Sequence, residues 1–261
     1  MRRRAASTIV LLAACRFNFD PLGAPSDGAG GDDTGDTLLD TSSLLDMSGD
    51  ATSSPLVQAV KSDNTSGAPI TINGGSGLTP VTAGNMVLVV CGGFNSPGLC
   101  TVSSTPATTW TNIDPGSTLG VYVACNAPAI TSITISNGAQ RMNMVVTEWS
   151  GVVASAGCFD QKRISTPCAT APTAWDTQLT PTVSQNRELL VAVTYADAAN
   201  AGWTIDPPYQ MGFNATGVNA AVNVMVGYQQ VNAPPMPYSA TGTVNSWQFA
   251  CFSDVFTFKA Q

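Results

Sequence analysis

The chain has 261 residues, with 10 basic and 17 acidic side chains, a formal net charge of −7 and no histidine. Nucleic-acid binding is excluded, because it needs a basic stripe that releases counterions from phosphates. The lack of histidine also excludes Ser-His-Asp and Cys-His catalysis and removes one of the two usual zinc ligands.

Residues 1–14 have the pattern of a secretory signal peptide, with Arg2, Arg3 and Arg4 followed by ten mostly apolar residues. A helix of that length spans about 15 Å, roughly half of a bilayer core, so this segment is too short to cross a membrane. The motif Leu12-Ala13-Ala14-Cys15 resembles the lipobox of bacterial lipoproteins. The resemblance implies that Cys15 is lipidated and becomes the mature N-terminus. A secretory signal that happens to contain a cysteine is the alternative.

The lipobox resemblance also predicts that the protein is located in the cell envelope, where the lipid anchors it to a membrane. The residue after Cys15 is Arg16 rather than aspartate, which by resemblance to a known sorting rule favours the outer membrane or cell surface.

Residues 15–54 have the composition of a disordered acidic linker. Eight of the seventeen acids lie between residues 16 and 54, where Arg16 is the only base, and aromatic residues are few. A flexible coil of this length has a root-mean-square span of roughly 35 Å. We therefore expect a solvated tether between the membrane and the rest of the chain. The repeated Leu-Leu-Asp at 38–40 and 44–46 allows an alternative, a short helix that docks on a partner.

Residues 55–261 form a body of short extended runs separated by turn residues. Runs 85–90 and 189–193 are apolar on both faces, which predicts strands covered on both sides. The run 222–230 alternates and predicts a half-exposed strand, and Ile133 and Ile135 alternate with polar neighbours in the same way. About twelve to fourteen such runs predict an all-β fold, an antiparallel and jelly-roll-like β-sandwich.

A weak internal repeat accompanies this pattern. Segments between 80 and 152 are echoed between 181 and 258, so that Trp110 corresponds to Trp203 and Val121 to Val224. We expect two related halves of one sandwich, and two small sandwiches in tandem are the alternative.

The body resembles a broad group of secreted bacterial β-sandwich modules. The resemblance is carried by residues 83–85, 87–90, 109–111, 148–152 and 249–258. These motifs mark strand ends and packing, and the group implies binding or surface display more than catalysis.

Six cysteines follow Cys15, an even number that in an exported chain predicts disulfides. Short sequence separations favour the pairs Cys91–Cys100 and Cys158–Cys168, which leaves Cys125 to pair with Cys251. Buried free thiols are the alternative.

Few residues offer catalytic or metal-binding chemistry. Glu148 lies on the same strand face as Met144 and Val146, and an acid there can act as a proton donor together with a loop aspartate such as Asp160. Loop oxygens of Asp160, Asp197 and Asn200 suit a structural calcium ion, although turn formation explains them equally well. No other cofactor is expected.

Aromatic side chains offer a possible ligand surface. Trp175, Tyr209 and Tyr238 lie in polar or proline-rich segments, where exposed rings stack on sugars. The other four tryptophans are expected in the core: Trp110, Trp149, Trp203 and Trp247. The sequence thus predicts a lipid-anchored, non-catalytic module that binds or displays glycans or an envelope protein. A carbohydrate-active hydrolase or lyase and a purely structural envelope protein are the alternatives.

Overall fold

The computed structural model describes residues 54–64, 66–93, 100–115, 119–136, 142–170, 173–197, 202–216, 223–245 and 250–261. The described residues all belong to one compact unit. The predicted signal peptide, Cys15 and the acidic linker up to residue 53 lie outside the described residues. Within the described ranges, no helix combines the length and the hydrophobicity needed to cross a bilayer.

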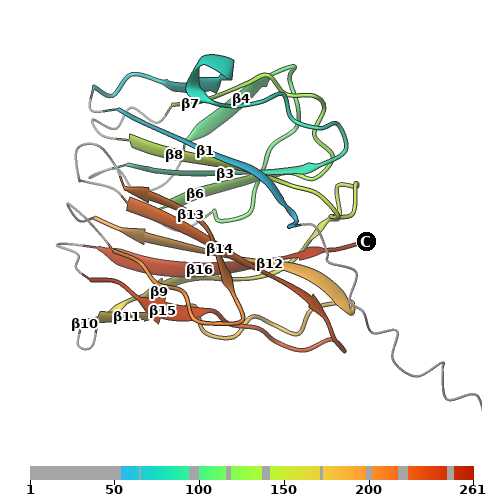
Figure 1. Ribbon diagram of the computed structural model, residues 1–261, viewed down its shortest axis with the longest axis vertical. Coiled ribbons are helices and arrows are strands. Elements are labelled where there is room, and N and C mark those ends of the chain that lie inside the picture. The colour runs from blue at the N-terminus through green and yellow to red at the C-terminus, as the bar shows by residue number, and fades with distance from the viewer. Residues whose placement is uncertain are drawn as a thin grey trace, which may run out of the picture. The chain divides into compact units, whose positions relative to one another are not determined.

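Two five-stranded antiparallel sheets form the centre of the fold (Figure 1). The N-terminal sheet has the order β1-β8-β3-β6-β5, and the C-terminal sheet has the order β13-β14-β12-β16-β9. Side chains from both sheets share one apolar core, so the predicted β-sandwich is confirmed. Its strands are β1 (Leu56–Asn64), β3 (Met86–Gly93), β5 (Thr111–Asn112), β6 (Leu119–Ala124), β8 (Met142–Trp149), β9 (Phe159–Pro167), β12 (Arg187–Ala196), β13 (Gln210–Thr216), β14 (Asn223–Asn232) and β16 (Cys251–Lys259).

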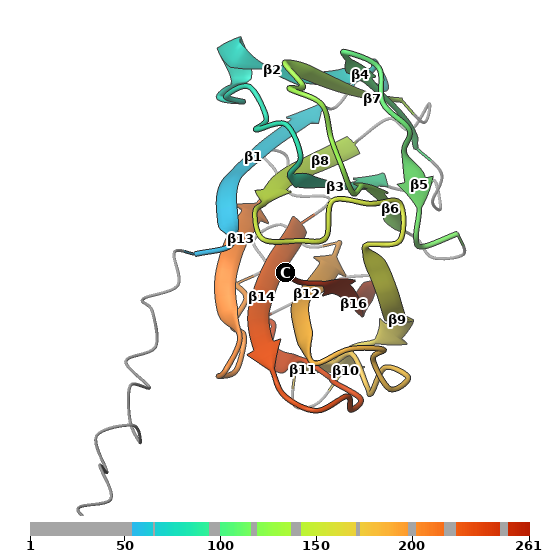
Figure 2. The same ribbon diagram turned by 90° about the vertical axis from the view of Figure 1, so that its right-hand side faces the viewer.

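Each central sheet is covered on its outer face by a three-stranded sheet (Figure 2). The N-terminal outer sheet, β2-β7-β4, packs Ile72 and Ile133 against Val87 and Val89 of β3. The C-terminal outer sheet, β10-β11-β15, closes a third core in which Trp175 meets Leu190. The strands of these outer sheets are β2 (Ile70–Asn73), β4 (Thr101–Thr105), β7 (Ser132–Ser136), β10 (Ala169–Thr170), β11 (Thr173–Asp176) and β15 (Thr241–Thr243).

The internal repeat is visible in the strand order. The N-terminal order β1-β8-β3-β6-β5 corresponds, strand for strand, to β9-β16-β12-β14-β13 in the C-terminal half. The sequence echo aligns the same pairs, since β3 matches β12, β6 matches β14 and β8 matches β16. The two related halves therefore place their central sheets against each other in one sandwich.

Burial follows the predicted patterns in all but one of the strands singled out. Strands β3 and β12 are buried on both faces, and β7 alternates as expected. The prediction that β14 is half-exposed is wrong. Asn223, Met225 and Gly227 on one face are as buried as the valines on the other face. Met225 packs in the core beneath the C-terminal outer sheet, a layer that strand periodicity does not report.

All six cysteines of the body form disulfides, but only one pairing is as predicted. Cys91–Cys100 is confirmed. The predicted bonds Cys158–Cys168 and Cys125–Cys251 are wrong, because Cys125 bonds Cys158 and Cys168 bonds Cys251. The segment between Cys158 and Cys168 is the nine-residue strand β9, not a loop. An extended strand of that length separates its ends by about 30 Å, far beyond the reach of a disulfide.

Candidate functional site

Glu148 is a buried structural carboxylate at the end of β8. It shares a strand face with Met144 and Val146, as predicted, and is 1% exposed. Its Oε2 accepts a hydrogen bond from Gln58 Nε2 at 2.5 Å. Its Oε1 accepts from the Thr82 backbone N–H at 2.9 Å and from Asn85 Nδ2 at 2.6 Å. The carboxylate thus holds β1 and the segment before β3 against β8.

Replacement of Glu148 by glutamine is expected to lower the free energy of unfolding by about 2 kcal/mol, because the new amide N–H₂ would face the Gln58 donor. Gln58 cannot simply flip, since its Oε1 accepts from both the backbone N–H and the hydroxyl of Thr79. Urea unfolding of the variant measures the loss. An unchanged midpoint would show that the network around Glu148 adds nothing to stability.

The structure does not bring Glu148 and Asp160 together as a catalytic pair. Asp160 lies on β9, where its Oδ2 accepts from the Ser184 backbone N–H at 2.5 Å. Glu148 points towards the N-terminal outer sheet, whereas Asp160 belongs to the outer face of the C-terminal sheet. Both central sheets therefore separate these acids, which a glycosidase would need within about 10 Å of each other across a cleft.

The acid that interacts electrostatically with Asp160 is Glu188, which no sequence motif marks. It is the second residue of β12 and is completely buried. Burial raises the pKa of Glu188 to about 8, helped by the charge of the nearby Asp160, while Lys259 opposes the rise. Burial, and then the nearby Glu188, also raises the pKa of Tyr238. Strand alternation could have predicted its burial, because Glu188 shares a strand face with the buried Leu190 and Ala192.

The three aromatic residues proposed as a sugar-stacking surface do not form one. Trp175 is 1% exposed, and its Nε1 donates to the carbonyl oxygens of Thr204 and Thr243. Gly242 passes so close that a Cβ there would lie 2.5 Å from Trp175 Cζ2. Tyr209 is also buried, and Tyr238 is half-buried. The C-terminal outer sheet and its loops cover these rings, so the prediction that they are exposed is wrong.

The other tryptophans are placed largely as expected. Trp149 and Trp203 are buried, and Trp110 is half-buried against the core of the N-terminal half. Trp149 also meets Tyr228 edge to face, with ring centroids 5.3 Å apart. Trp247 lies outside the described residues.

The calcium hypothesis gains no support from the described residues. Asp197 is buried, and its Oδ1 accepts from the Ala250 backbone N–H at 2.7 Å. Asn200 lies outside the described residues. Over the described ranges, no group of three or more cysteine, aspartate or glutamate side chains is arranged to hold a metal ion.

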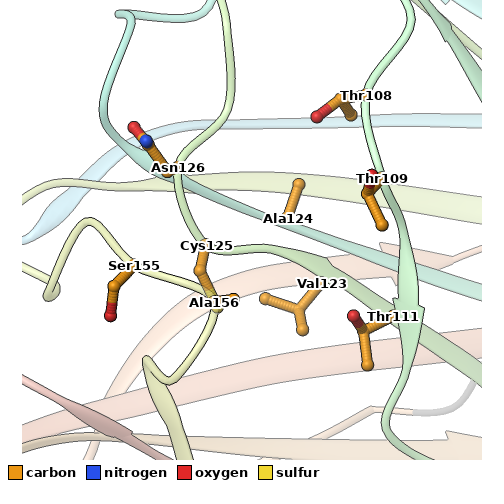
Figure 3. A pocket seen from close by; sticks show the side chains of 9 residues that line it. All are labelled: Thr108, Thr109, Thr111, Val123, Ala124, Cys125, Asn126, Ser155 and Ala156. Atoms are coloured by element: carbon orange, nitrogen blue, oxygen red, sulfur yellow. The ribbon is translucent and has the colours of Figure 1, made fainter.

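A pocket of about 310 Å³ opens at one end of the N-terminal sheet. Figure 3 shows the segment of Thr108 and Thr109 on one side and the turn of Ser155 and Ala156 on the other, with the end of β6 between them. The lining side chains are small and uncharged: Thr108, Thr109, Thr111, Val123, Ala124, Cys125, Asn126, Ser155 and Ala156.

Covalent and backbone bonds hold the pocket walls in place. The Cys125–Cys158 disulfide ties the residue after β6 to the segment that enters β9. Within that segment, the Cys158 N–H donates to the Ser155 carbonyl oxygen at 3.1 Å, and the Ser155 N–H donates to that of Val153 at 2.8 Å. This site could not be predicted from the sequence. Thr109 and Thr111 belong to a motif that indicates the fold, and the Cys125–Cys158 bond was not predicted.

No protein-family model, curated protein or solved structure matches this chain.

Proposed function

We propose that the protein is a lipid-anchored module of the cell envelope whose β-sandwich binds a ligand without catalysing a reaction. The proposed location is based on the Leu12-Ala13-Ala14-Cys15 motif and the acidic segment that follows it. The binding role rests on the uncharged, hydroxyl-lined pocket beside the Cys125–Cys158 disulfide.

The pocket chemistry favours a neutral ligand rich in hydroxyl groups, such as one residue of a glycan. Threonine, serine and asparagine side chains donate and accept hydrogen bonds, while Val123 and Ala124 offer apolar contacts. A sugar ring presents the same mixture, with hydroxyls at its rim and C–H groups on its faces. The pocket volume of about 310 Å³ is at the small end of the usual range for ligand sites, which suits a single ring.

The internal hydrogen bonds of Glu148 argue against its use as a catalytic acid. Both of its oxygens accept from protein donors, so its carboxylate already has a role in holding β1 and β8 together. The hydrolase or lyase alternative would need another acid or a rearrangement of this network.

A glycan array probed with the Cys15→Ser chain, which lacks the proposed lipid site, tests the proposal. We expect binding to a neutral glycan, with at least a tenfold loss of affinity in Ala156→Trp, because the indole fills the pocket. Ala154→Trp is the matched control, since Ala154 is an exposed residue of the same turn that does not line the pocket.

Equal affinity in both tryptophan variants would place binding elsewhere and contradict the proposal. Release of cleaved glycan by the wild-type chain would favour the hydrolase or lyase alternative. If no glycan binds at all, the structural envelope role becomes the better explanation.

A further inference from the structure

Three ionisable side chains lie in a row across adjacent strands at one end of the C-terminal sheet. Glu188 is on β12, Lys259 is on β16 and Asp160 is on β9. Glu188 and Lys259 are cross-strand partners, and so are Phe258 and Phe159, the chain neighbours of Lys259 and Asp160. Because Phe159 and Phe258 pack towards the central core, alternation directs the three ionisable side chains to the opposite face.

The three groups lie close together. Lys259 Nζ lies 4.0 Å from Asp160 Oδ1, and the two side chains are 31% and 5% exposed. Glu188 is completely buried, neither of its carboxyl oxygens has a hydrogen-bond partner among the described residues, and its charge couples to those of Asp160 and Lys259. The Ser184 backbone N–H, 2.5 Å from Asp160 Oδ2, holds that carboxyl group in place. An amine and two carboxyl groups are thus held close together, with both carboxyl groups shielded from water.

We propose that Lys259 and Asp160 become joined by an amide bond between Nζ and Cγ, with Glu188 relaying the proton. The modification is independent of the ligand-binding function proposed above.

The reaction needs no oxidant or co-substrate. Lys259 passes one proton of its ammonium group to the Asp160 carboxylate with which it is paired, and the resulting amine attacks Cγ of that carboxyl group, which forms the C–N bond and a tetrahedral intermediate. Glu188 takes a proton from the nitrogen and delivers one to a departing Asp160 oxygen, so that the C–O bond breaks and one water molecule leaves. The product is a neutral secondary amide, and Glu188 regains its original protonation state.

Two features of the site favour this step. Burial and Asp160 raise the pKa of Glu188 to about 8, so Glu188 retains a proton at neutral pH and can pass it on. Strand pairing holds amine and carboxyl side by side, so the step is intramolecular and does not require two molecules to meet.

The amide would lock one end of the β9–β16 pair, and a disulfide already locks the other. Cys168 directly follows β9, and its partner Cys251 is the first residue of β16. Asp160 and Lys259 lie at the opposite ends of the same two strands. With both links formed, this strand pair could not separate, which suits a module exposed at a cell surface.

Peptide mass spectrometry of the reduced, trypsin-digested full chain tests the proposal. We expect a branched species that joins the peptide containing Asp160 to the peptide containing Lys259 and is lighter than their sum by one water molecule. Trypsin should fail to cleave after Lys259, because its amine is acylated. Lys162→Arg is the matched control on β9 and should leave the branched peptide unchanged.

Lys259→Arg should abolish the branched peptide, and Glu188→Gln should slow its formation at least tenfold. Two separate, unmodified peptides in the wild-type digest would overturn the amide and leave Lys259 and Asp160 as an ion pair. Formation at the wild-type rate in Glu188→Gln would overturn the proton relay. The wild-type digest alone decides whether the amide exists, so a poorly folding variant does not obscure the result.

Discussion

Replacement of both Cys168 and Cys251 by alanine is expected to lower the free energy of unfolding by about 4.5 kcal/mol, the chain-entropy value for a loop of this length. The bond spans 83 residues and therefore restricts the unfolded chain strongly. The matched control is the Cys91/Cys100 double alanine variant, whose bond spans 9 residues and should contribute only about 2.6 kcal/mol. Urea unfolding at one pH measures both.

The comparison should be made in a Lys259→Arg background, where the proposed amide cannot form. The amide would close nearly the same loop as Cys168–Cys251, so the loss in the wild-type background should be clearly smaller. Equal losses for the two double variants would contradict the loop-length argument. Peptide mapping without reduction checks the connectivity separately, and a Cys158–Cys168 peptide would contradict the observed pairing.

The second large effect is a fall in stability as the pH rises from about 4.5 to about 8. Burial, followed by the charge of Asp160, raises the pKa of Glu188 from 4.5 to about 8 in the folded protein. Between these values the folded state holds a proton that the unfolded state has lost, so each step up in pH favours unfolding. We expect Glu188 to contribute a loss of about 3 kcal/mol, allowing for relaxation around the buried group.

Glu188→Gln removes this titration and should flatten the stability profile over the same pH range. Urea unfolding of wild type and variant at pH 5 and pH 8 gives the difference directly. Because burial is the largest cause of the shift, the direction holds whether or not Asp160 has reacted with Lys259. Parallel profiles for the two proteins would show that Glu188 is solvated as well in the folded state as in the unfolded state.

Sequence periodicity predicted the all-β class and several individual strands. The apolar runs of β3 and β12 correctly indicated strands covered on both faces, and the alternation of β7 was also correct. The internal echo predicted two related halves, which the matching strand orders confirm. These features are local, or repeat at a regular interval, so a single sequence carries them.

The candidate sites could be predicted only in part. The strand face of Glu148 was correct, but its three hydrogen-bond donors come from Gln58, Thr82 and Asn85, far away in the sequence. Glu188 directly precedes the apolar run 189–193, and only the fold shows that it is buried near Asp160. Alternation states which residues share a face, but not what packs against that face.

The sequence by itself determined the strand-rich body, its duplication, the local Cys91–Cys100 bond and the motif that predicts a lipid anchor at Cys15. Only the tertiary structure decided the other two disulfides, the burial of Trp175 and the meeting of Asp160, Glu188 and Lys259. The physical reason is the same in each case. These features depend on strand neighbours and covering sheets from distant parts of the chain, whereas a side-chain pattern reports only the period and faces of its own strand.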